Sequence, residues 1–153
     1  MNAQSMLLFL HIGAVVVWVG GMFFAYFCLR PTALQLFDPA QRLRLWHAVL
    51  SRFFAWVWAA VIVIAVSGVL MFWQHGLRGA PQGWHLMSAS GTAMIAIYIY
   101  VATVSFTALS RAVKSEDWKA GGMALNRIRQ LVATNLVLGF VTIAFATIGV
   151  VFL

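Results

Sequence analysis

Charge is confined to short segments of this chain, and the long segments between them carry none. Four uncharged runs separate the charged ones, at residues 1–29, 53–77, 79–110 and 130–153. Each run reaches the roughly 20 apolar residues that an α-helix needs to cross the hydrocarbon core of a bilayer. The pattern predicts an all-α integral membrane protein, a bundle of four transmembrane helices at about residues 5–29, 53–75, 85–110 and 130–153.

Nine of the ten Lys and Arg residues lie in two of the three connecting loops. The first basic loop holds Arg30, Arg42, Arg44 and Arg52, and the second holds Arg111, Lys114, Lys119, Arg127 and Arg129. Short loops rich in Lys and Arg stay on the cytoplasmic side of a membrane. We therefore expect both basic loops to lie inside and both termini outside, with residues 1–153 forming a single membrane domain.

The composition excludes several classes of function. Charged residues make up 8% of the chain, against about a quarter in a soluble domain. The net charge of +7 belongs to loops that flank membrane helices, so no nucleic acid is expected as a partner. Because no Asp or Glu falls in a predicted span, a carboxylate proton relay and a hard-cation transport site are disfavoured. Hydrolase chemistry lacks its orienting acid, and no catalytic residue is assigned.

Local signals set the expected helix ends. Pro31 should prevent the first helix from continuing beyond Leu29. Asp38 and Pro39 form a good N-cap and first turn, so the second helix is expected to begin there, before its membrane crossing. The pair Gly121-Gly122 should break the second basic loop before a basic turn leads into the fourth helix.

Histidine and methionine side chains gather toward the outer ends of the predicted helices. His11 lies within the first helix, His75 closes the second, and His85 opens the third. Met71 precedes His75 by four residues and therefore shares its helix face. Imidazole together with thioether suits copper, and thioether favours Cu(I). The sequence predicts a copper site at His11, His75, His85 and Met71.

Other interpretations of the same residues stay open. Two histidines on different helices, such as His11 and His85, are able to hold a b-type haem axially. Interface histidines also cap helix ends, and methionine is an ordinary filler of packed cores. His47 lies toward the inner side, where we expect a packed interfacial side chain. Enzymatic activity stays open in the same way, and a haem-dependent oxidoreductase is the class that the residues would allow.

Asn135 is the one amide side chain expected deep in the fourth helix. An amide in a membrane span needs a hydrogen-bond partner on a neighbouring helix. Candidate partners on the third helix are Ser88, Thr92 and Thr103.

Two segments carry a family resemblance. The sequence from Leu10 to Gly21, with a His, an apolar stretch and then Trp-x-Gly-Gly, resembles the opening helix of CopD-type (copper resistance protein D) membrane proteins. Ile128 to Gly139 is similar to the same family's arginine-led entry into a later helix, and Ser67-Gly68 is a less specific likeness. The resemblance implies copper uptake or resistance in a bacterial inner membrane, with multi-pass topology and, given the basic loops, periplasmic termini.

The first helix is also similar to that of HemJ-like proteins, for which protoporphyrinogen oxidation and haem binding would be implied. Those proteins carry a basic residue early in their third helix, where this chain has Ser88 and Ser90. Their Asn-Glu-x-Pro pattern is not matched around Asn135. A haem b oxidoreductase of this type is therefore the alternative to the CopD-like interpretation.

The leading hypothesis is a CopD-like protein in copper handling, whether binding, uptake or delivery, through the outer His and Met cluster. Its partners would be the lipid bilayer, a second copy or a larger membrane complex, and a periplasmic copper donor. A third hypothesis is an accessory subunit of a membrane complex with no chemistry of its own.

Overall fold

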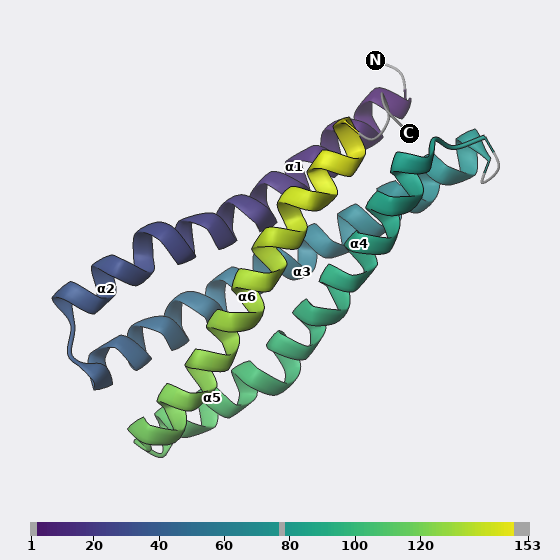
Figure 1. Cartoon of the computed structure of the whole chain (residues 1–153). Helices are drawn as coiled ribbons and strands as arrows, with labels where there is room; N and C mark the ends of the chain where they lie inside the picture. The colour runs from purple at the N-terminus through teal and green to yellow at the C-terminus, as the bar shows by residue number, and fades with distance from the viewer. Residues whose placement is uncertain (1–2, 77–78, 149–153) are drawn as a thin grey trace.

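The computed structural model describes residues 3–76 and 79–148, and within them every long segment is helical. The described residues form four long helical rods, which run antiparallel to their neighbours in sequence (Figure 1). The rods are Ala3–Leu36, Pro39–Gln74, Gln82–Lys114 and Trp118–Thr147. In chain order the elements are α1 Ala3–Phe24, the π-helix η1 Ala25–Leu29, α2 Arg30–Leu36, α3 Pro39–His75, α4 Gln82–Tyr100, the π-helix η2 Val101–Ser105, α5 Phe106–Lys114 and α6 Trp118–Thr147. The four rods are each long and apolar enough to cross a membrane, which confirms the predicted all-α four-helix bundle.

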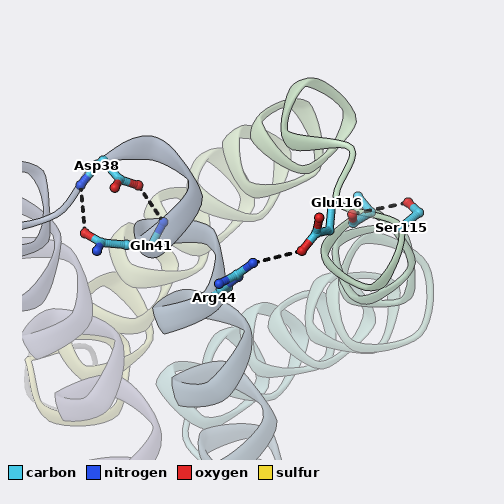
Figure 2. Close-up of polar contacts among 6 residues, drawn as sticks. Asp38, Gln41, Arg44, Ser115 and Glu116 are labelled. Atoms are coloured by element: carbon cyan, nitrogen blue, oxygen red, sulfur yellow. Dashed lines mark hydrogen bonds and ion pairs between the residues drawn. The ribbon is translucent and has the colours of Figure 1, made fainter.

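The junction between the first two rods is built as the sequence predicted. Asp38 caps α3, since its Oδ1 accepts a hydrogen bond of 2.8 Å from the Gln41 amide. The Gln41 side chain returns a bond to the Asp38 amide, so the two residues form a capping box (Figure 2). This arrangement satisfies two of the backbone donors that every helix start leaves free.

The first rod does not end at Leu29, so the expectation based on Pro31 was wrong. The helix widens into a π-turn over η1, in which the Arg30 amide donates to the Ala25 carbonyl five residues back. Pro31 then sits in the first turn of α2, where a missing N–H costs least. The π-turn accommodates Pro31 without ending the helix, and the rod continues to Leu36.

The fourth rod begins at Trp118 rather than near residue 130, and Gly121-Gly122 lies inside α6 instead of breaking the loop. Asp117 caps this helix by accepting a 2.9 Å bond from the Ala120 amide. A Cβ at position 121 would lie 3.0 Å from Leu43 Cδ1. Gly121 therefore serves the close approach of α6 to α3. The predicted end at residue 153 lies outside the described residues.

The centre of the bundle is aromatic and joins three of the rods. The ring of Tyr98 in α4 lies 5.8 Å from Trp18 of α1 and 5.7 Å from Phe54 of α3, between ring centroids. Its hydroxyl donates a 3.0 Å hydrogen bond to the Phe54 carbonyl. All three side chains are buried. Edge-to-face aromatic contacts of this kind favour one packing arrangement over its alternatives.

An ion pair at the edge of the bundle joins the beginning of α3 to the turn between α5 and α6. Arg44 of α3 donates to Glu116, between α5 and α6, at 2.9 Å (Figure 2). Both side chains are more than half exposed, with relative accessibilities of 60% and 67%. Exposed pairs contribute little stability, so helix packing rather than charge holds the rods together.

Two glycines in the bundle should respond oppositely to the same substitution. A Cβ at Gly139 would lie 3.1 Å from Val19 Cγ2, whereas one at Gly20 meets nothing within 4 Å. We expect Gly139→Leu to destabilise the folded protein by about 1–3 kcal/mol through overpacking. Gly20→Leu should be neutral or slightly stabilising because a helix interior disfavours glycine. Helix content followed through titration with a denaturing detergent measures both, and equal stability of the two variants would contradict this packing.

Candidate functional site

The predicted ligands lie toward one end of the bundle, where α1 begins, α3 ends and α4 begins (Figure 1). His11 lies in α1, Met71 and His75 in α3, and His85 in the first turns of α4. The end of α6 reaches the same end of the molecule (Figure 1). The alternation of the four rods therefore places the backbone positions of these residues toward the same end of the bundle.

His11 makes a specific contact across the interface between α1 and α3. Its Nδ1 lies 2.8 Å from the Ser67 hydroxyl, and both side chains are at least half buried. Ser67 has one hydroxyl proton, which it donates to the Val63 carbonyl at 2.5 Å. The hydroxyl oxygen must then accept from His11, so we assign the proton of the imidazole to Nδ1. This tautomer leaves the Nε2 lone pair available to a metal ion.

Met71 lies on the α3 face that His11 contacts. It follows Ser67 by four residues, which places it about 40° away around the helix and about 6 Å further along its axis. Its side chain is buried, with 8% exposed. Gly68 lies between Ser67 and Met71 in the sequence and has no side chain, so the His11 ring packs close to the α3 backbone. A Cβ at position 68 would lie 3.8 Å from His11 Cε1. An imidazole and a thioether thus share one face near the end of α3.

His85 contacts α3 on another face and at another level. Its exposed ring lies 5.6 Å from the ring of Phe72, between centroids. Phe72 is five residues beyond Ser67, so it lies about 140° around the helix and about 7.5 Å along it. His11 and His85 therefore contact different faces of α3, at different heights along its axis.

The backbone position of His75 falls between these two faces, about 80° around α3 from Ser67 and 60° from Phe72. Its side chain lies outside the described part of the structure. Among the described residues, no three His, Cys, Asp or Glu side chains come together as a metal site. In the described geometry, His11 contacts the face of α3 that carries Met71, whereas His85 contacts a different face, about 7.5 Å further along the helix. A site made of all four residues stays a prediction.

His47 lies toward the opposite end of α3, twenty residues before Ser67, or about 30 Å along the helix. Its Nε2 is 3.1 Å from the Ser110 hydroxyl, and its ring stacks on Phe106 at 5.5 Å with an interplanar angle of 9°. Both contacts tie α3 to α5. His47 is therefore a packed interfacial side chain, remote from His11.

Asn135 does bond to another helix, but not to the expected hydroxyls. Its side-chain nitrogen donates to the Met94 carbonyl of α4 at 3.1 Å. Thr92 and Thr103 instead donate to carbonyls of their own helix. A second bond between the same helices, from Thr142 to Ser90 at 2.8 Å, was not anticipated. Asn135 is a structural link between α4 and α6.

Ser67 is the residue of the candidate site that the sequence did not single out. It entered only as part of a family likeness, yet it positions His11. The available signal was its spacing, because Ser67, Met71 and His75 follow one another at intervals of four along α3. Such spacing places successive side chains on one helix face.

The fold and these residues define a multi-pass membrane protein of four helices. The family model described as Copper resistance protein D (CopD) matches residues 47–149, about two thirds of the chain. The chain therefore belongs to the CopD family, which is linked to copper resistance. No curated protein and no solved structure matches it.

The matched segment includes Met71, His75 and His85 but not His11. It also contains Ser67-Gly68 and the segment from Ile128 to Gly139, whereas the opening-helix likeness at residues 10–21 lies before it. The match gives no support to the HemJ-like alternative or to haem b. His11 is thus linked to the family region through its hydrogen bond to Ser67.

The assigned tautomer is directly measurable. In protein labelled with ¹⁵N-histidine, we expect His11 to show a protonated Nδ1 and an unprotonated Nε2, because Ser67 accepts its proton. Ser67→Ala removes the acceptor and should shift the population toward the other tautomer. His11→Gln identifies the signal, and His47 serves as an internal control that should not change. A wild-type His11 protonated at Nε2 would show that Ser67 does not hold the ring in this way.

Proposed function

We propose that this protein binds copper and passes it on at the end of the bundle where α1 begins and α3 ends. The ion is a substrate in this proposal, and the soft ligands are His11 and Met71, with His75 and His85 nearer the tip. Membership of the CopD family supports copper over other metals. The chemistry agrees, since imidazole and thioether favour Cu(I) and suit hard cations poorly.

The observation that carries the proposal is the hydrogen bond between His11 and Ser67. An imidazole within a membrane span is costly and marks a functional site by default. Here one nitrogen is used to orient the ring, and the other is left with its lone pair. Metal-binding histidines are commonly oriented through such a bond on the second nitrogen.

His11 and His85 contact α3 at different levels, and this separation favours transfer of copper from one ligand to the next over binding in a single closed site. His85 meets α3 at the level of Phe72, about 7.5 Å beyond the level at which His11 meets Ser67. The exposed His85 is suited to receive copper from a donor, and the half-buried His11 with the buried Met71 is suited to hold it inside the bundle. Position 75 lies between the two faces of α3 and would link them. A periplasmic copper donor is the partner that this order of steps requires.

Copper affinity tests the proposed ligands. In competition with a chromophoric Cu(I) chelator, His11→Gln and Met71→Leu should each lower the affinity of the purified, reduced protein by about tenfold or more. Ser67→Ala should cost about 10–100-fold, the range found when a partner that orients a metal ligand is removed. His75→Gln and His85→Gln should slow copper uptake more than they lower the final occupancy.

His47→Gln and Met123→Leu are matched controls, because His47 lies in the remote half of α3 and Met123 is exposed near the start of α6. Wild-type affinity in every variant of the four proposed ligands would overturn the proposal and favour an accessory subunit. A visible spectrum of the preparation adds an independent outcome. A reducible Soret band that is lost in His11→Gln would assign the site to haem b.

The direction of transfer depends on topology. We infer a bacterial inner membrane with both termini periplasmic, because nine of the ten basic residues fall within residues 30–52 and 111–129, toward the opposite end. Alkaline phosphatase fused after residue 153 should be active, and green fluorescent protein at the same place should be dark. The reverse pattern would place the His and Met end in the cytoplasm and turn the proposal into one of export or cytoplasmic delivery.

A further inference from the structure

A cavity of about 280 Å³ lies at the other end of the bundle, between the first rod, α3 and α6. Its walls have two kinds of chemistry. Apolar and aromatic side chains form most of the lining, among them Tyr26, Trp46, Phe53 and Trp118. Three arginines join them, Arg30, Arg42 and Arg129, and no acidic residue lines the cavity.

Among the described residues, no carboxylate forms an ion pair with the three arginines of this cavity. The sequence has three acidic residues, and each is engaged elsewhere. Asp38 and Asp117 cap α3 and α6, and Glu116 pairs with Arg44. Arg44 is not among the residues that line the cavity. An anion from outside would therefore meet three arginines that form no ion pair within the described residues.

Arg30 shows most clearly that the cavity lacks a hydrogen-bond acceptor for its arginines. Its Nε is buried without a hydrogen-bond partner, and its guanidinium lies 5.2 Å from the centroid of the Tyr26 ring. A buried donor without a partner costs free energy that a suitable acceptor would recover. Arg129 does have a partner, the Asn126 side chain on the same helix, but that amide is neutral. A ligand with anionic oxygens would satisfy both arginines.

The depth of the cavity matches that of lipid headgroups. Arg30 follows the start of α1 by 27 residues, or about 40 Å of helix, which exceeds the roughly 30 Å hydrocarbon core. If the hydrocarbon core begins near the start of α1, the cavity lies at the level of the phosphates of the other leaflet. Basic pockets between transmembrane helices at this level bind anionic headgroups.

We propose that this cavity binds an anionic phospholipid of the surrounding leaflet. The phosphodiester would lie among Arg30, Arg42 and Arg129, and the first part of an acyl chain would lie against Tyr26 and Trp46. The volume is near the lower end of the 300–1,000 Å³ typical of ligand pockets, so it suits a headgroup with the start of one chain. The rest of the chain would leave past Leu34, which lines the cavity and is 50% exposed.

A free inorganic anion would leave the larger, apolar share of the lining unoccupied. That lining is the reason to favour a lipid over phosphate alone. The proposal is independent of copper binding, because His11 lies nineteen residues before Arg30 on the first rod, or about 29 Å along the helix.

Lipid retention tests the site in the full chain. Purified protein in nanodiscs of mixed phosphatidylglycerol and phosphatidylcholine should keep phosphatidylglycerol preferentially after transfer to detergent, as read by native mass spectrometry. Replacing Arg30 and Arg42 by Gln should weaken that retention by about 30-fold, if each arginine contributes as basic residues at membrane surfaces do. Arg52→Gln with Arg111→Gln is the matched control, since these arginines are exposed and do not line the cavity, and it should retain lipid as the wild type does.

A second variant fills the space and keeps every charge. A Cβ at Gly122 meets nothing within 4 Å, and this residue lines the cavity. Gly122→Phe should therefore exclude the lipid without disturbing the fold, whereas Gly20→Phe, equally open in α1, should not. Circular dichroism establishes that both variants stay helical.

Three outcomes would overturn the proposal. Equal loss of lipid in the cavity and control arginine variants would show a diffuse charge effect. Full retention in Gly122→Phe would place the lipid elsewhere. Release of the bound phosphatidylglycerol by millimolar inorganic phosphate would show that the arginines bind a free anion rather than a lipid.

Discussion

The absence of water in the bilayer core constrains every other feature of this protein. A backbone group without a hydrogen bond costs several kcal/mol there, so helices satisfy their own donors and acceptors. Side chains follow the same rule. Most described hydroxyls donate to a carbonyl three or four residues back, as Thr103 does to Ile99 and Thr134 to Gln130. Among the described residues, fewer polar side chains reach another helix than bond within their own.

Four of the polar contacts between rods in the described part of the chain illustrate their roles. Tyr98 bonds to the Phe54 carbonyl, Asn135 to the Met94 carbonyl, and Thr142 to Ser90. These three fix which helices pack together and at what height. The fourth, between His11 and Ser67, differs because its imidazole keeps a nitrogen free for a ligand. The geometry that orders the bundle thus also prepares its candidate copper site.

Local signals predicted well where the local chain makes its own hydrogen bonds. The N-cap at Asp38 and the first-turn Pro39 are adjacent in the chain, so the helix start was readable from sequence, and α3 begins where expected. The predictions at Pro31 and Gly121 failed for two different reasons. A π-turn upstream took up the proline, and the space that Gly121 leaves is filled by Leu43 from another helix. The partner of Asn135 was missed because it is a backbone carbonyl, and every residue type has one, so the sequence does not show which carbonyl lies at the helix interface.

The sequence by itself determined the four spans, the all-α class and the gathering of His and Met residues toward one end, because charge and hydropathy set which segments enter a bilayer. It also carried a resemblance to the CopD family, to which the chain belongs. Only the tertiary structure decided that Ser67 holds His11, that Met71 shares its face while His85 meets another, and that three arginines border one apolar cavity. These relations depend on the rotation and height of each helix against its neighbours, which side-chain packing sets and hydropathy does not.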